Sequence, residues 1–251
     1  MGSLPPQHSA DGLPRGIDIS ATLSELFMAD LDSEIKKIDG IFFYARYVDD
    51  IIVIYNANKK SIENECNTII SSHGLAINCN KKKVICFDEH YGIKHDFDFL
   101  GYNFKITSRR KEKQVEVNVA KSKINKQKIR IAHAFVAYSK DRDLPLLKRR
   151  LRFLSGVVHL QSDNRGVLSA GNAFNYSELT NEASLKELDK YVYRILRGKR
   201  TRVGLLLEST IPENTIRELL NISFRVGYRD RLAMNYSRLQ AKKIKKAWIA
   251  S

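Results

Sequence analysis

Two adjacent carboxylates, those of Asp49 and Asp50, lie between two apolar runs that favour β-strands, at residues 42–47 and 51–55. Asp is depleted in strands and its charge is costly to bury, so this pair requires an explanation. One explanation is a tight hairpin turn over residues 48–50, because Asp is a common turn residue. The other is a divalent cation, since Mg²⁺ takes oxygen ligands, usually one or two carboxylates together with substrate phosphates. The pair by itself leaves both explanations open.

A loop and a predicted helix precede this pair. Residues 12–20 hold two glycines and a proline within five residues, which is typical of a loop, whereas residues 1–11 are expected to be flexible. Ser20 is a good N-cap for a helix at about residues 21–38, where apolar residues recur at helical spacing. A glycine-rich loop before a helix can let a nucleotide approach the backbone, or it can be an ordinary start of a helix.

The elements after the pair continue a mixed α/β half. A helix over residues 61–73 is predicted to end at Gly74. A second hairpin has Phe99-Leu100-Gly101-Tyr102 at its centre. The remaining predictions are short strands at 75–78 and 84–87, a loop at 88–96, hairpin strands within 97–107 and a returning strand at 115–119.

The composition changes at about Ala120, where a basic half begins. Its apolar residues recur at helical spacing, and its polar positions are rich in Lys and Arg. The predicted helices cover residues 120–139, 144–160, 184–196, 212–220 and 223–249. The expected fold class is therefore α+β, with a small antiparallel sheet and helices followed by an all-helical half.

The charge of the chain indicates a polyanionic partner. Its 251 residues carry 43 Lys and Arg against 28 Asp and Glu, and phosphate neutralisation dominates nucleic-acid affinity. An anionic membrane surface is less favoured, because the sequence shows no lone amphipathic anchor, and no apolar run reaches transmembrane length. Three cysteines without CxxC spacing, and no secretory signal in residues 1–11, predict a reduced, cytoplasmic protein without a zinc site.

The order of these motifs resembles the palm of reverse transcriptases, of the bacterial kind found in retrons, group II introns and phage-defence systems. Four motifs follow in that order: Gly12-x-Pro14-x-Gly16-x-x-x-Ser20, Tyr47-x-Asp49-Asp50, Gly74-Leu75-x-x-Asn78-x-x-Lys81 and Phe99-Leu100-Gly101-Tyr102. Arg46, directly before Tyr47, also fits the bacterial members. The resemblance implies a partial palm with a primer-grip hairpin over residues 12–119, a helical thumb over 120–160 and a basic helical region over 161–251.

The resemblance also implies a reaction, RNA-directed DNA synthesis from dNTPs with Mg²⁺, or alternatively Mn²⁺. Asp49 and Asp50 would be metal ligands, Asp50 the weaker or outer one, at a site where two metals activate the primer hydroxyl and stabilise the leaving pyrophosphate. Lys81 would approach the triphosphate and protonate pyrophosphate. The residues implied to contact template and nucleotide are Leu13, Pro14, Arg15, Gly16, Ser20 and Tyr47. Arg15 replaces the Gln that is common in the family, which leaves the detail of that contact open.

The remaining implied contacts are with a template–primer duplex, an RNA template paired with a DNA or RNA primer. Phe99, Leu100, Gly101 and Tyr102 would form the primer grip, or simply a buried aromatic hairpin. Basic residues of the predicted thumb would contact phosphates. They are Lys121, Lys123, Lys126, Lys128, Arg130, Lys148, Arg149, Arg150 and Arg152. A structured non-coding RNA in a retron or antiviral defence system is the expected partner, and no membrane is expected.

One metal-binding aspartate of the family has no match in this sequence. In the family it lies on a strand several tens of residues before the glycine loop, and neither Asp11 nor Asp18 fits that motif. The fingers and the residue that screens the sugar 2′-hydroxyl are missing with it. Three accounts stay open: a C-terminal fragment of a longer polymerase, which is favoured, a second polypeptide that supplies these parts, or a non-catalytic nucleic-acid-binding descendant. We expect no polymerisation by the chain alone, and an RNA-dependent RNA polymerase, which shares the palm, also stays open as the parent enzyme.

Overall fold

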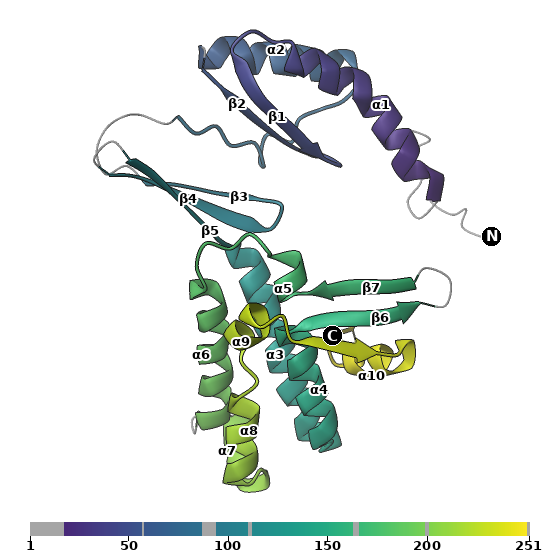
Figure 1. Ribbon diagram of the computed structural model, residues 1–251, viewed down its shortest axis with the longest axis vertical. Helices are drawn as coiled ribbons and strands as arrows, with labels where there is room; N and C mark the ends of the chain where they lie inside the picture. Colours follow the sequence, from purple (N-terminus) through teal and green to yellow (C-terminus); the bar gives the residue numbers. More distant parts are fainter. Residues whose placement is uncertain are drawn as a thin grey trace, which may run out of the picture. The chain divides into compact units, whose positions relative to one another are not determined.

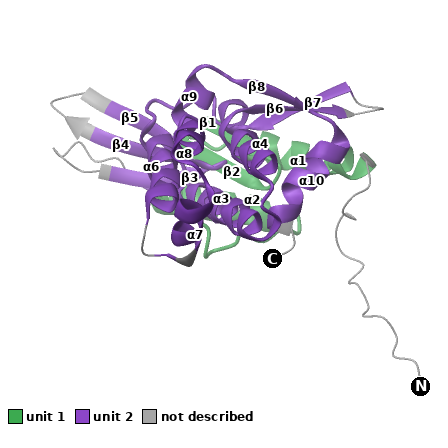
Figure 2. Cartoon of the chain, turned by 90° about the horizontal axis from the view of Figure 1, so that it is seen from below, with its two compact units in different colours: residues 1–84 green, residues 85–251 purple. Residues whose placement is uncertain are grey.

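The computed structural model describes residues 18–56, 58–86, 94–109, 112–162, 166–198 and 201–249. Helices and small sheets alternate along the chain, in agreement with the expected α+β class (Figure 1). The chain divides into two compact units, residues 1–84 and 85–251, which Figure 2 colours separately. In the described part of the chain, none of the helices is long and apolar enough to cross a membrane.

The first unit packs two helices against one face of a two-stranded antiparallel hairpin (Figure 1). Its elements are α1 (Asp18–Lys36), β1 (Ile41–Tyr47), β2 (Asp50–Tyr55) and α2 (Lys59–Ser72). Its core contains Met28, Leu31 and Ile35 of α1, which recur every three or four residues, and Ile62 of α2. Because helix residues with this spacing share one face, α1 rests on the hairpin along a single apolar stripe.

Alternation along the strands gives the hairpin two different faces. Tyr44 pairs with Val53, and both pack against the core of the unit, so this face is the one that the helices cover. Tyr47 pairs with Asp50, and both side chains are exposed. Residues two apart along a strand share a face, so Tyr47 and Asp50 belong to the face away from the helices.

The second unit begins with a three-stranded antiparallel sheet and continues into a helical core. The strands are β3 (Lys94–Phe99), β4 (Tyr102–Arg109) and β5 (Glu112–Val119). The helices that share the largest buried cluster are α3 (Lys121–Asp141), α4 (Leu144–Ser155), α6 (Ala183–Arg197), α7 (Arg202–Thr210), α8 (Glu213–Leu220) and α9 (Phe224–Arg229). Phe135 and Phe224 are among the side chains buried at its centre.

A separate three-stranded sheet lies within this unit. Its strand order is β7 (Gly166–Gly171), β6 (Val157–Ser162), β8 (Ala233–Tyr236), and the short helix α5 (Asn172–Asn175) follows β7. β6 runs antiparallel to β7 and parallel to β8. α10 (Arg238–Ile249) and α4 pack on this sheet through a second buried cluster that includes Leu146, Val158, Tyr236 and Ile244.

Most predicted elements are confirmed, with boundaries that shift by a few residues. Both hairpins, the helix before the carboxylate pair, the helix ending at Gly74 and the helices at 120–139, 184–196 and 212–220 are present. α1 begins at Asp18, so Ser20 lies within its first turn and is not an N-cap. Residues 75–78 and 84–86 form no strand, because no partner strand pairs with them in the described chain, and residue 87 lies outside it.

The prediction of an all-helical second half is wrong. Gly156 ends α4, and a Cβ at this position would lie 2.5 Å from the carbonyl oxygen of Leu232, so the chain here needs glycine for a close backbone approach. The β-branched Val157 and Val158 then start β6, whose partner β8 is some seventy residues further along the chain. The pairing of β8 with β6 also divides the predicted helix at 223–249 into α9, β8 and α10. Residues 94–96, which were predicted as part of a loop, belong to β3, where they pair with residues 105–107 of β4.

Candidate functional site

A two-residue turn, Val48 and Asp49, connects β1 to β2, and the carboxylate pair consists of Asp49 in the turn and Asp50, the first residue of β2. Val48 has a φ of 59°, in the left-handed region. Two-residue hairpins commonly use turns with positive φ, but Gly or Asn normally occupies such positions, and a β-branched residue there is strained. Strain of this kind concentrates at functional sites, where the surrounding structure must hold it in place.

The two carboxylates of the turn are available to a ligand. Asp49 and Asp50 are exposed, and neither side chain has a hydrogen bond or an ion pair with another described residue. Exposed carboxylate oxygens suit Mg²⁺ or Mn²⁺, which one or two carboxylates can hold together with phosphates and waters. Within the described ranges, however, no group of three or more His, Cys, Asp or Glu side chains could hold a metal ion. Among the described residues, the pair alone therefore offers two carboxylates to a divalent cation.

The side chain of Arg46 connects the turn to α1. Its Nη1 donates to the carbonyl oxygen of Val48 at 3.0 Å. Its Nε and Nη2 each donate to one carboxylate oxygen of Asp32 at 2.8 Å. Its Nη1 and Nη2 also donate to Glu25, at 3.1 and 2.8 Å. The hydroxyl of Tyr44 donates to Asp32 at 2.6 Å, so a second residue of β1 contacts the same carboxylate.

This network is strongly polarised, because a buried cation lies against two anions. The Arg46 side chain is only 5% exposed. Hydrogen bonds from Arg46 hold the pKa values of Asp32 and Glu25 below their usual range, and the same contacts raise the pKa of Arg46. Burial, followed by the hydrogen bond to Asp32, raises the pKa of the Tyr44 hydroxyl well above its usual value. The guanidinium thus stays charged and occupied, and it holds the turn against α1.

The other residues that the resemblance implies at the nucleotide include four residues of the glycine loop and Lys81. Leu13, Pro14, Arg15 and Gly16 lie outside the described residues. Lys81 is exposed in a turn where its backbone N–H donates to the carbonyl of Asn78, and no described contact joins its side chain to the carboxylates.

The predicted primer-grip hairpin belongs to the second unit and is held by backbone contacts. Leu100 and Gly101 form its two-residue turn, with φ values of 50° and 85°. The backbone N–H of Ala120 donates to the carbonyl of Gly101 at 2.9 Å. Tyr102 is partly buried, donates its hydroxyl proton to the carbonyl of Asn175 and packs edge-on against Tyr176. The aromatic residue therefore has a packing role, and Leu100 is the exposed member of the turn.

The excess of positive charge lies in the second unit of the chain. Residues 85–251 hold 34 Lys and Arg against 17 Asp and Glu, whereas residues 1–84 hold 9 against 11. Among the cations predicted to contact phosphates, five are exposed and have no partner in the described chain. They are Lys121, Lys123, Lys126, Arg149 and Arg152.

Three other predicted cations are already paired. Lys128 donates to Glu187, and Lys148 donates to Glu218. Arg150 is buried and donates to Asp141 at 3.1 Å, so its side chain is not available at the surface as predicted. Its spacing from Leu147 and Leu154 places it on the apolar side of α4, which the number of basic residues in this stretch obscured.

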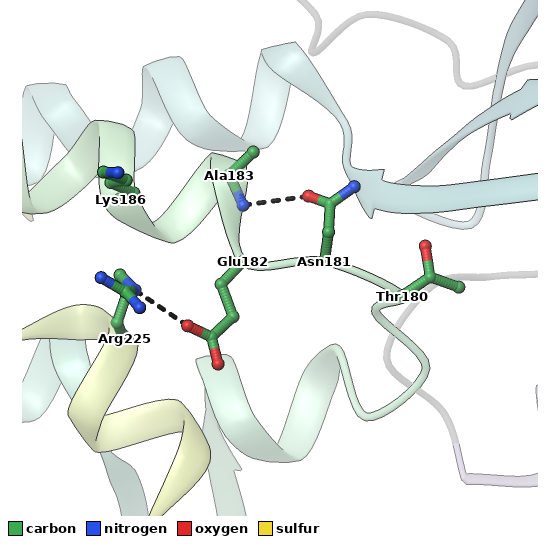
Figure 3. Close-up of a pocket in the computed structure, with 6 residues that line it drawn as sticks. All are labelled: Thr180, Asn181, Glu182, Ala183, Lys186 and Arg225. Carbon is green, nitrogen blue, oxygen red and sulfur yellow. Dashed lines mark hydrogen bonds and ion pairs between the residues drawn. The ribbon is translucent and has the colours of Figure 1, made fainter.

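A hollow of about 410 Å³ lies at the start of α6 in the second unit (Figure 3). Glu182 accepts a hydrogen bond from Arg225 at 2.8 Å, and Asn181 accepts one from the backbone of Ala183 at 3.0 Å. Arg229 also pairs with Glu182. Glu182 and Arg225 are thus engaged with each other, and the remaining charged residue among the described residues that line the hollow is Lys186.

The contacts of Arg46 with α1 were missed by sequence reasoning, although one signal was available. Glu25 and Asp32 are seven residues apart, which places two acids on one face of a helix next to a strand that carries an arginine. This spacing also occurs on ordinary solvent-exposed faces, so it predicts the contact only together with the packing of α1.

A protein-family model matches part of the chain. Residues 4–104 match the family model for reverse transcriptase (RNA-dependent DNA polymerase). The match includes the carboxylate turn, both helices of the first unit and β3, and it ends within β4. Neither curated proteins nor solved structures gave a match to the chain. The reverse transcriptase resemblance is thus supported at the family level, and residues 105–251 lie outside the match.

Proposed function

We propose that this chain is the palm and thumb portion of an RNA-directed DNA polymerase that transfers nucleotides from dNTPs to a primer 3′ hydroxyl. One observation carries the proposal. Two exposed carboxylates without partners lie on a strained turn, inside a segment that matches the reverse transcriptase family. A hairpin turn that had only to reverse the chain would not need this strain or the charged network behind it.

In this proposal Asp49 and Asp50 hold the divalent cation. A bound Mg²⁺ or Mn²⁺ would supply charge neutralisation at the transferring phosphoryl group and activation of the primer hydroxyl. The chain itself presents the two carboxylates to solvent from a turn fixed against α1. Tyr47, which is 65% exposed on the same face as Asp50, is the surface on which the primer end rests.

The ligand set requires a further carboxylate from outside the described residues, because two carboxylates do not complete a two-metal site. We propose that this carboxylate comes with the fingers, either from a further segment of the polymerase or from a second polypeptide. The chain alone is then expected to bind metal weakly and not to polymerise.

The second unit supplies affinity for the template–primer duplex. The exposed cations of α3, Lys121, Lys123 and Lys126, together with Arg149 and Arg152 of α4, contact phosphates without reading sequence. Leu100, at the tip of the β3–β4 hairpin, contacts the primer strand. A structured RNA of a retron or phage-defence system is the partner we propose, since 34 cations in this unit exceed what a small nucleotide would need.

A second candidate function is nucleic-acid binding without chemistry. Two observations favour it: the described residues lack a third carboxylate at the turn, and the second unit carries a large excess of positive charge. Under this hypothesis RNA binding needs no Mg²⁺ and survives Asp49→Asn and Asp50→Asn.

Primer extension distinguishes these functions. The chain is assayed alone and with a polypeptide that supplies the fingers and the further aspartate, on an RNA template with a DNA primer and either dNTPs or rNTPs. We expect extension only in the supplemented reaction and only with dNTPs, and loss of about a thousandfold or more on Asp49→Asn. Asp30→Asn, which removes an exposed carboxylate of α1 in the same unit, is the matched control and should keep full activity. Extension with rNTPs in place of dNTPs, or extension that Asp49→Asn leaves intact, would contradict the proposal.

A further inference from the structure

The turn that carries the carboxylates has no glycine or asparagine at its position of positive φ. Val48 adopts a positive φ without being glycine, asparagine or aspartate. Its carbonyl oxygen is nevertheless fixed, because it accepts a hydrogen bond from Arg46 at 3.0 Å. Hydrogen bonds from a charged donor are stronger than neutral ones, and this donor is almost completely removed from water.

Arg46 is itself held in place from the opposite side. Both carboxylate oxygens of Asp32 accept from it at 2.8 Å, in the parallel geometry that fixes a guanidinium most tightly. Asp32 lies on α1 directly after Leu31, which is completely buried in the core of the unit. The side chain of Arg46 therefore joins the turn to α1.

We propose that Arg46 is a positioning residue for the carboxylate pair. By holding the Val48 carbonyl against α1, it selects the left-handed turn from which Asp49 and Asp50 project, and so raises the affinity of the pair for a divalent cation. Glu25 and Asp32 have a second effect in this arrangement, since they occupy the guanidinium and keep it from neutralising the metal ligands. This inference rests on the proposed function, because it assumes that the pair binds a metal.

The experiment is a titration of the full chain with Mn²⁺, in which electron paramagnetic resonance measures the free ion. Arg46→Lys keeps the positive charge but cannot reach Asp32, Glu25 and Val48 together, so the dissociation constant should rise about tenfold, as on loss of an outer-shell partner at metal sites. Tyr44→Phe is the matched control. Tyr44 donates to the same oxygen of Asp32 but makes no described contact with the turn, so its loss should leave Mn²⁺ affinity within about twofold.

A double-mutant cycle tests the mechanism more directly. Val48→Gly lets the turn adopt positive φ without strain, so the turn then depends less on Arg46. We expect Arg46→Lys to weaken Mn²⁺ binding by less than about threefold in the Val48→Gly background, against about tenfold in the natural sequence. Hydrogen exchange of α1 and α2 is followed in every variant to report on the fold.

Several results would overturn the inference. Unchanged Mn²⁺ affinity in Arg46→Lys, an equal loss in Tyr44→Phe, or the same loss in both Val48 backgrounds would each contradict a local role. A loss accompanied by faster exchange throughout α1 and α2 would show general unfolding, and would also contradict it. If Asp49→Asn and Asp50→Asn leave Mn²⁺ binding unchanged, the proposed function fails, and the inference fails with it. Binding that depends on both aspartates but not on Arg46 refutes the inference alone.

Discussion

Two hairpin turns, the one between β1 and β2 and the one between β3 and β4, reach a left-handed backbone conformation in different ways. Each has two residues, and in each an exposed aliphatic side chain, Val48 or Leu100, has a positive φ. In the first turn the side chain of Arg46 reaches back to the turn carbonyl. In the second, Gly101 takes the other left-handed position, and its carbonyl is held by the backbone of Ala120.

The difference indicates which changes should alter the conformation of each turn. The first depends on ionised side chains of a separate helix, so its shape should respond to pH and to substitutions on α1. The second depends on glycine and on a backbone hydrogen bond, so it should respond mainly to added side-chain bulk. In the first turn Asp49 occupies the position that Gly101 takes in the second, so no glycine is present there. The charged clamp formed by Arg46, Asp32 and Glu25 supports the first turn instead.

The largest effect is expected from Asp32→Ala. It leaves the guanidinium of Arg46 and the hydroxyl of Tyr44 without their shared acceptor, and hydrogen bonds that involve a charged group typically contribute about 1.5–3 kcal/mol. We expect the free energy of opening of α1 and β1, measured by hydrogen exchange, to fall by about 2–3 kcal/mol.

Two comparisons check this prediction. Asp30→Ala removes an exposed carboxylate from the same helix and should change the stability by no more than about 0.5 kcal/mol. Trp248, the single tryptophan, lies in the second unit, so its fluorescence should report an unchanged unfolding transition in both variants. If Asp30→Ala and Asp32→Ala destabilise α1 equally, the clamp contributes nothing beyond helix surface charge.

The second effect in size is expected from Gly101→Ala. A side chain at φ 85° costs about 1–2 kcal/mol, and the added Cβ would lie 3.2 Å from Cε of Lys123. Gly166→Ala is the matched control, because Gly166 also has a positive φ, 70°, but a Cβ there would meet nothing within 4 Å. Urea unfolding followed by Trp248 fluorescence should show a larger loss of unfolding free energy for Gly101→Ala than for Gly166→Ala. Equal losses would mean that the Lys123 side chain moves away from the added methyl group at little cost.

The sequence predicted the carboxylate turn well because its determinants are local. Two strand-like runs and a turn residue between them lie within fifteen positions, and the pairing of Tyr47 with Asp50 follows from that proximity. The clamp could not be predicted in the same way. Whether Asp32 meets Arg46 depends on how α1 crosses the hairpin, and this is set by core packing and not by the charged residues themselves.

The β7–β6–β8 sheet of the second unit was missed for a related reason. β8 has only four residues, which is too short for alternation to be recognised, and its partner β6 lies far away in the sequence. The apolar residues on either side continue the helical pattern, so a single long helix was the simpler interpretation. Gly156, where two backbones meet closely, was the local sign that this interpretation was wrong.

Acidification is expected to have a smaller effect on stability, and of the two turns only the first should respond to it. The pKa of Asp32 is lower in the folded chain than in the unfolded one, so its stabilisation is present above about pH 4 and is lost as the pH falls through the folded value. The loss by pH 3 should be smaller than that of Asp32→Ala, because protonation is then incomplete. Hydrogen exchange of β1 between pH 6 and 3, corrected for intrinsic rates, should show a stability loss that is reduced in Asp32→Asn. An equal pH dependence in the variant would assign the effect to other carboxyl groups.

The smallest effect is expected from Val48→Gly, and here the sign is informative. Glycine relieves the left-handed strain, about 1–2 kcal/mol, but loses about 0.5–1 kcal/mol through the greater freedom of the unfolded chain. The net change should therefore be a gain of about 0.5 kcal/mol in the stability of the first hairpin, measured by hydrogen exchange of β1 and β2. Leu100→Gly should gain less, because leucine is not branched at Cβ and its positive φ is less strained. A loss of stability in Val48→Gly that exceeds the loss in Leu100→Gly would mean that Val48 is held by contacts of its own, and that Arg46 is not the principal support of the turn.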